Sequence, residues 1–331
     1  VEKKEDHFLV RTTDDESYEA RSVVIATGAA HRHLGLPRED SLAGVSYCAV
    51  CDGAFYKEKD VLVVGGGPAG VCAAIAAGRL GMKTLLVEQN GFCGGMATAG
   101  LVGPFMTCYD SKGEKMIIKG LFEEIVDRLV KKGFAIHPKD VMGGTAFTSW
   151  IKIGHDHVTP FESEGLKLVL DEMLCEAGID VLYHTMFLEP VLEENKIVGI
   201  NVASKSGIES IEGNVIIDCT GDGDLCAFGG AEYEKGDPNG AVMPPTLCSI
   251  WSGIDKDKCN EPWNEHVEQA YKDGVLSYED RHIPGFFHGN DGISGGNIGH
   301  IFDVDPTDEA ELTDGMLWIE NGSDGPVAFN A

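Results

Sequence analysis

The stretch from residue 60 to residue 88 has the hydrophobic pattern of a strand, a helix and a second strand. The run VLVV at residues 61–64 predicts a buried strand, and KTLLVE at residues 83–88 predicts another. Between them, the Ala-rich residues 69–80 are expected to form a helix. Strand, helix and strand in this order predict a parallel β-α-β unit, which is typical of α/β proteins.

Further helices and strands are predicted on the C-terminal side of this unit. Apolar residues recur at helical spacing in residues 121–131 and 164–177. Residues 180–218 return to the alternation of strands, with a hairpin turn expected at residues 193–195 and a buried strand at residues 215–218.

The two ends of the chain have weaker patterns. Residues 7–12 and 18–28 read as strands, whereas residues 29–59 are irregular. A glycine-rich turn and a short helix are expected over residues 220–236. From residue 237 onward, dense glycine and polar residues predict mainly loops.

Composition narrows the class of protein. The 331 residues are 43% hydrophobic, which is enough for a sizeable core and excludes a disordered or collagen-like chain. The formal net charge of −28 argues against nucleic acid or anionic lipid as a partner. No stretch reaches the roughly 18 apolar residues that a membrane helix needs, so a soluble chain is expected.

The ten cysteines indicate a reducing compartment. They are scattered, with a single CxxC at Cys48 and Cys51, so free thiols are expected rather than a disulfide framework. Because the N-terminus has no apolar signal core, the expected location is the cytoplasm. The sequence opens at Val1 in the middle of a pattern, which indicates a fragment.

The turn after the first central strand carries the strongest chemical signal, because it reads Gly65-x-Gly67-x-x-Gly70. In such a turn the first glycine permits the tight bend, the second lets the backbone touch a pyrophosphate, and the third lets helix pack on strand. Glu88 ends the second strand, where a carboxylate can accept hydrogen bonds from ribose hydroxyls. Together these features predict a dinucleotide-binding site.

Beyond Glu88 the sequence resembles the FAD-dependent oxidoreductases of the two-dinucleotide-binding-domain group. The segment GGGPAGVCAAIAAGRLGMKTLLVEQNGFCGGMATAGLV (65–102) is similar to the opening of the large bacterial family of that name. The similarity continues through residues 164–185, 215–236 and 297–308, and so covers most of residues 60–310.

This resemblance implies non-covalently bound FAD and a set of residues around it. The implied contacts are Gly65, Gly67, Pro68, Ala69, Gly70 and Glu88 at the phosphates and ribose, Gly94, Gly95, Met96 and Thr98 on the flavin side, Phe187 near the adenine, and Thr220, Gly221 and Asp222 after the strand at residues 215–218.

The first 60 residues resemble a different family, the thioredoxin reductases. The matching segments are VIATGA (24–29), LGLP (34–37) and CAVCDGAFY (48–56). The resemblance implies that Cys48 and Cys51 form a redox-active disulfide and that Asp52 serves as an acid. Two thiols in a CxxC lie within disulfide reach, so one can attack and the other resolve.

The two resemblances meet at the glycine turn. A thioredoxin reductase would bind NADPH there, but Glu88 would repel the 2′-phosphate of that cofactor. We therefore expect a natural fusion or an assembly chimera of two flavoproteins, incomplete at both outer ends.

The expected fold is α/β, with a Rossmann-like, doubly wound FAD domain and a mixed, β-rich substrate region. Residues 1–59 form an incomplete thioredoxin-reductase-like segment, residues 60–236 the FAD domain with a helical insertion, and residues 237–331 a truncated, loop-rich substrate region.

Three hypotheses of function follow. The first is an FAD-dependent oxidoreductase that moves a hydride or electron pair between a small organic substrate and an acceptor. The second is a thioredoxin-disulfide reductase that uses Cys48 and Cys51, with a thioredoxin-like partner and NAD(P)H as electron donor. The third is a non-catalytic dinucleotide-binding remnant.

A few isolated residues complete the candidate chemistry. His300 is a candidate acid or base on the substrate side. Cys93 and Cys108 lie near the second glycine pair, where they either exchange electrons with flavin or are buried thiols. His155 and His157 lack a clear third ligand, so no metal is expected.

Overall fold

The computed structural model divides the chain into two units, Val1–Tyr56 and Lys57–Ala331. The residues that it describes are 2–4, 8–11, 17–20, 59–141, 157–253, 263–275, 286–288 and 293–321. The first unit contains an antiparallel sheet of three short strands, β1 (Glu2–Lys3), β2 (Phe8–Arg11) and β3 (Ser17–Ala20). These confirm the first two predicted strand regions in part, and the β-rich run at residues 22–28 lies outside the described residues.

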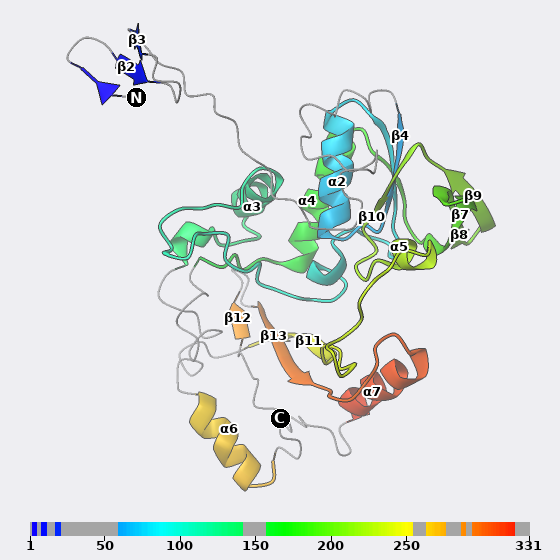
Figure 1. The fold of residues 1–331 in the computed structure, drawn as a ribbon. Helices are drawn as coiled ribbons and strands as arrows, with labels where there is room; N and C mark the ends of the chain where they lie inside the picture. The colour runs from blue at the N-terminus through cyan, green and yellow to red at the C-terminus, as the bar shows by residue number, and fades with distance from the viewer. Residues whose placement is uncertain are drawn as a thin grey trace. The chain divides into compact units, whose positions relative to one another are not determined.

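The second unit is built on a four-stranded parallel sheet (Figure 1). Its order is β10 (Val215–Asp218), β4 (Asp60–Val64), β5 (Lys83–Val87) and β6 (Asp180–Leu182). After β6 the chain leaves this sheet and returns as β10, on the other side of β4. The strand order therefore reverses between β4 and β10, and ligands of such sheets bind outside the carboxyl ends of the strands at that point.

The sheet is covered on both faces because alternate residues of β4 point in opposite directions. Val61 and Val63 join a core cluster with residues of α2 (Pro68–Arg79), α3 (Leu121–Lys132) and α4 (Ser163–Glu176). The intervening residues of β4, Leu62 and Val64, pack instead with Ile200 and Val202 of β8. The unit thus has three layers: helices, a parallel sheet and an antiparallel sheet.

That antiparallel sheet consists of β7 (Met186–Glu193), β8 (Lys196–Ser204) and β9 (Gly207–Glu212). The predicted hairpin turn is confirmed, since β7 ends at Glu193 and β8 begins at Lys196. Glu194 takes a positive φ of 54°, which a tight turn requires.

The predicted helices are confirmed to within two residues at each end, and their ends follow from local chemistry. Pro68 opens α2, where its missing N–H costs no helical hydrogen bond. In α3 the acidic Glu123 and Glu124 lie in the first turn and two lysines in the last, which complements the helix dipole. Gly133 then ends α3 in the left-handed conformation, with φ of 85°.

The prediction of loops beyond residue 237 is wrong in large part. The described residues there form an antiparallel sheet of order β11 (Thr246–Ser252), β13 (Ile293–His300) and β12 (Phe286–His288), together with α6 (Trp263–Lys272) and α7 (Glu309–Asn321). Glycines hid β13, because Gly295 and Gly296 lack the side chains by which strands are recognised. As the central strand, β13 is paired along both edges, which offsets its poor intrinsic preference. None of the helices described is long and apolar enough to cross a membrane.

Candidate dinucleotide-binding site

The glycine turn (residues 65–70) connects β4 to α2 at the switch point. Gly65 has φ of 97°, and a Cβ on it would lie 2.2 Å from the carbonyl oxygen of Cys219, which follows β10. A Cβ on Gly70 would lie 1.8 Å from the carbonyl oxygen of Gly65. These two glycines are therefore required by close backbone contacts within the fold.

Gly67 differs from both of them, because a Cβ on this residue would meet no atom within 4 Å. It is the N-cap of α2 with an ordinary extended backbone, and its own lack of a side chain leaves the helix without a side-chain cap. The N–H groups of a first helical turn have no partner within the helix, and together with the helix dipole they attract anions. The turn therefore leaves open space for an anion beside Gly67.

Glu88 joins the glycine turn to the end of β5. Its side chain is only 4% exposed, and its Oε2 accepts a hydrogen bond from the Gly66 N–H at 2.6 Å. Its Oε1 accepts from both the N–H and the Nδ2 of Asn90, each at 2.7 Å. A carboxylate has about four acceptor positions, so these three bonds leave capacity for a ribose hydroxyl. No sequence motif marks Gly66 or Asn90 as the two residues that orient Glu88.

The second glycine loop (residues 91–98) packs against the glycine turn. The Gly94 N–H donates to the Gly66 carbonyl at 2.8 Å, and a Cβ on Gly95 would lie 2.9 Å from the Gly67 Cα. Met96 is 64% exposed at the rim of this loop. Thr98 is buried, and its hydroxyl donates to the Cys93 carbonyl at 2.8 Å, so Thr98 shapes the loop from within.

The segment that follows β10 lies against the same turn. We define residues 219–223 as the Thr220 loop. The Cys219 N–H donates to the Val64 carbonyl at 2.8 Å, which fixes the start of the loop beside β4. Gly221 has φ of 99° and Asp222 is exposed. The predicted residues of the glycine turn, the second glycine loop and the Thr220 loop thus come together at one edge of the sheet.

The remaining predicted site residues are Phe187, His300 and three residues of the CxxC segment. Phe187 packs with the β8 side of the core and stacks on Phe228, with ring centroids 6.1 Å apart. His300 ends β13 and lies beside Phe302, with ring centroids 6.3 Å apart. Cys48, Cys51 and Asp52 lie outside the described residues. The roles of all five stay predictions.

The described cysteines are all free thiols, and Cys93, which lies beside Gly66, is buried. Burial raises the pKa of Cys93 to about 12, although a hydrogen bond with the Tyr183 hydroxyl opposes the rise. Burial also raises the pKa of Cys108. Because the thiolate is the reactive form, these environments favour buried, unreactive thiols over electron exchange with flavin.

His157 has a structural environment. It is buried, its Nδ1 lies 2.9 Å from the Pro138 carbonyl oxygen, and its ring stacks on Tyr109 at 3.9 Å. Its predicted companion, His155, lies outside the described residues. Within the described part of the chain, no group of three His, Cys, Asp or Glu side chains could hold a metal ion.

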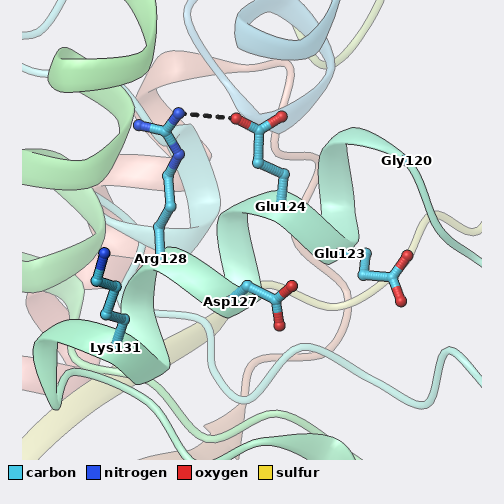
Figure 2. A pocket seen from close by; sticks show the side chains of 6 residues that line it. All are labelled: Gly120, Glu123, Glu124, Asp127, Arg128 and Lys131. Atoms are coloured by element: carbon cyan, nitrogen blue, oxygen red, sulfur yellow. Dashed lines mark hydrogen bonds and ion pairs between the residues drawn. The ribbon is translucent and has the colours of Figure 1, made fainter.

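A hollow on the exposed face of α3 is lined mainly by charged side chains, among them the ion pair of Arg128 and Glu124 (Figure 2). Arg128 binds Glu124 at 2.8 Å and Glu176 of α4 at 2.6 Å, while Arg79 of α2 binds Glu124 at 2.7 Å. The hydrogen bond from Arg79, followed by that from Arg128, lowers the pKa of Glu124 to about 2. These pairs connect α2, α3 and α4. Arg79 is the last residue of α2, at the opposite end of that helix from the glycine turn.

The residues at the sheet edge fit the adenosine and pyrophosphate parts of FAD. Gly67 leaves space beside the N-terminus of α2 for a phosphate, and Glu88 retains acceptor capacity for a ribose hydroxyl. The second glycine loop brings further backbone without side chains to this place, since a Cβ on Gly95 would lie 2.9 Å from the Gly67 Cα. Such an arrangement can bind a dinucleotide through main-chain N–H groups and one carboxylate.

Comparison with known proteins gives two overlapping matches. Residues 60–310 match the FAD dependent oxidoreductase family, and residues 1–101 match the pyridine nucleotide-disulphide oxidoreductases. The chain is 45% identical over 85 residues to thioredoxin reductase of Listeria monocytogenes, which is 25% of this chain and 27% of that protein. The identity to thioredoxin reductase of Bacillus subtilis is 46% over 85 residues, with the same two shares.

The chain thus spans about a quarter of the length of the curated relatives that it matches. Among solved structures, L-proline dehydrogenase from P. horikoshii is similar with a TM-score of 0.44 and 15% identity, over 80% of this chain and 78% of that one. The first family match extends over most of the chain. The protein therefore belongs to the FAD dependent oxidoreductase family.

Proposed function

We propose that this protein is an FAD-dependent oxidoreductase acting on a small organic substrate. The observation that carries the proposal is the open backbone at Gly67, which lies between the Glu88 carboxylate and the second glycine loop. When bound, FAD supplies a ring that accepts a hydride or an electron pair. The chain supplies the binding and the orientation of that ring.

The three loops have separate tasks in this proposal. The first turn of α2 binds the pyrophosphate through its N–H groups, and Glu88 accepts a hydrogen bond from the ribose. The second glycine loop, with Gly94, Gly95 and Met96, borders the flavin side, and the Thr220 loop closes the FAD domain. Phe187 and His300 are assigned to the adenine and to substrate acid-base chemistry, respectively.

We assign residues 1–59 to a thioredoxin-reductase-like segment, residues 60–236 to the FAD domain and residues 237–331 to the substrate region. The boundary between the units Val1–Tyr56 and Lys57–Ala331 falls close to the first of these limits. The seven described cysteines are free thiols, which supports a reducing location such as the cytoplasm.

The test of the main proposal is flavin uptake by the purified chain. We expect the protein to bind FAD at one equivalent per chain and to show the visible absorbance of a flavin. A folded, colourless protein that takes up no added FAD would support the non-catalytic remnant instead. A panel of small organic substrates, with reduction of a dye as the readout, then tests the oxidoreductase activity.

A second candidate function is supported by the thioredoxin reductase matches over the first part of the chain. In this alternative one thiolate of Cys48 and Cys51 attacks a substrate disulfide and the other resolves the mixed disulfide. The electrons are replaced by NAD(P)H, and the partner is a thioredoxin-like protein. Cys48→Ser should abolish reduction of a model disulfide, whereas unchanged reductase activity would remove this candidate.

A further inference from the structure

The carboxylate of Asp218, the last residue of β10, collects three hydrogen bonds. Its Oδ1 accepts from the Thr220 N–H at 3.0 Å and from the Thr220 hydroxyl at 2.8 Å. Its Oδ2 accepts from the Cys226 N–H at 2.9 Å. Burial alone raises the pKa of Asp218, but these hydrogen bonds outweigh it, and the pKa lies below its usual range. The carboxylate is therefore ionised and bonded through both of its oxygens to the segment that follows it.

The bonds of Asp218 replace a missing helix cap. The short helix α5 (Asp224–Phe228) begins after Gly223, which has no side chain to cap it. The Thr220 hydroxyl accepts from the Asp224 N–H at 2.8 Å while it donates to Asp218. Asp218 and Thr220 together thus satisfy N–H groups of the first turn of α5, which would otherwise lack partners.

This use of the Thr220 hydroxyl limits what the Thr220 loop can offer to a cofactor. The hydroxyl donates its single proton to Asp218 and accepts from Asp224, so its main bonding capacity is used inside the protein. Gly221 has φ of 99° and open space where a Cβ would be. The loop consequently presents main chain to the sheet edge, and its shape depends on Asp218.

The Thr220 loop in turn touches the glycine turn. The Cys219 carbonyl oxygen lies so close to Gly65 that a Cβ there would be 2.2 Å away. Any movement of the Thr220 loop therefore changes the space beside Gly65 and the route across the switch point between β4 and β10.

We propose that Asp218 is a positioning residue that holds the Thr220 loop in the shape that receives FAD. Asp218 acts through Thr220 and Cys226 rather than by contact with the cofactor. The inference rests on the proposed function, since it assigns a role within the FAD site.

The chain contains a matched control for this proposal. The Asp305 Oδ1 accepts the same two hydrogen bonds from Thr307, from the Thr307 N–H at 2.9 Å and from the Thr307 hydroxyl at 2.8 Å. Its other oxygen binds Lys235 at 2.6 Å. Asp305→Asn therefore removes the charge of an equivalent Asp-x-Thr turn that we assign no part in binding FAD.

The experiment measures FAD affinity of the purified full chain by quenching of flavin fluorescence, with thermal unfolding of the FAD-free protein alongside. In Asp218→Asn the side-chain NH2 group replaces one carboxylate oxygen. It therefore faces an N–H group from which that oxygen accepts a hydrogen bond in the wild type. We expect FAD to bind about 10- to 100-fold more weakly to Asp218→Asn. Asp305→Asn should bind FAD as the wild type does, even if its unfolding temperature falls by as much as that of Asp218→Asn.

Variants of Thr220 keep the test decisive if Asp218→Asn does not fold. Thr220→Val removes the hydroxyl and should weaken FAD binding, whereas Thr220→Ser retains it and should restore the affinity. Equal FAD affinity in the wild type, Asp218→Asn and Thr220→Val would overturn the role of Asp218, and so would equal weakening by Asp305→Asn. A wild type that binds no FAD would instead overturn the proposed function and this inference with it.

Discussion

Two loops meet at the carboxyl ends of the neighbouring strands β4 and β10, and they are built in opposite ways. The glycine turn is fixed by what it lacks, because side chains at Gly65 and Gly70 would collide with backbone carbonyls. The Thr220 loop is fixed by what it has, namely the bonds of Asp218 to Thr220 and Cys226. The first loop cannot accept a side chain at Gly65 or Gly70, whereas the second depends on the side chains of Asp218 and Thr220.

The largest expected effect comes from adding a methyl group to the first loop. Gly65→Ala forces a residue with a Cβ to φ of 97° and against the Cys219 carbonyl. We expect it to lower the free energy of unfolding by about 3 kcal/mol or more, measured by urea denaturation. Gly81→Ala is the control, because Gly81 has φ of 82° but open space around it. That variant should lose only about 1 kcal/mol; equal losses would show that the contact with Cys219 is unimportant.

The next prediction separates folding from binding within the same turn. Gly67→Ala meets no atom within 4 Å, so its free energy of unfolding should change by less than about 1 kcal/mol. The added methyl group lies where the pyrophosphate is proposed to pass, so FAD affinity should fall at least about tenfold. Fluorescence titration and urea denaturation on the same sample check both parts. A loss of stability with unchanged FAD affinity would show that Gly67 is needed for folding and not for binding FAD.

The second loop should respond to pH. The pKa of Asp218 is lower in the folded protein than its ordinary value, so its contribution to stability is present above the ordinary Asp range and is lost as the pH falls through the folded pKa. At neutral pH we expect Asp218→Asn to be less stable than the wild type by about 1 kcal/mol. In acid the free energies of unfolding of the two proteins should become equal, as measured by urea denaturation at several pH values. A difference that is constant with pH would contradict an ionised Asp218.

The smallest effect is expected at the charged pairs on the helix surface. Arg79→Ala removes the ion pair with Glu124 but leaves Arg128 in place. Because such exposed pairs contribute little, we expect a loss of about 0.5 kcal/mol and unchanged FAD affinity. A loss several times larger would mean that the three helix ends, rather than the two loops, limit the stability of this unit.

The difference between the two loops also explains how far the sequence predicts the structure. The glycine turn could be predicted because its requirements are local: Gly65, Gly67 and Gly70 are spaced by the geometry of one strand, turn and helix. The role of Asp218 could not, because it depends on a helix that begins six residues later without its own cap. Strand β13 was missed for a related reason, since its stability comes from partners on both sides and not from its glycine-rich sequence.

Hydrogen exchange of the backbone amides, measured with and without FAD, tests the central claim most directly. The account predicts that FAD slows exchange in peptides covering residues 65–70, 91–98 and 219–223, which are the three loops at the sheet edge. Peptides from β7, β8 and β9 away from that edge should change little. FAD that binds while these three loops exchange as before, or that protects only other regions, would contradict the proposed site.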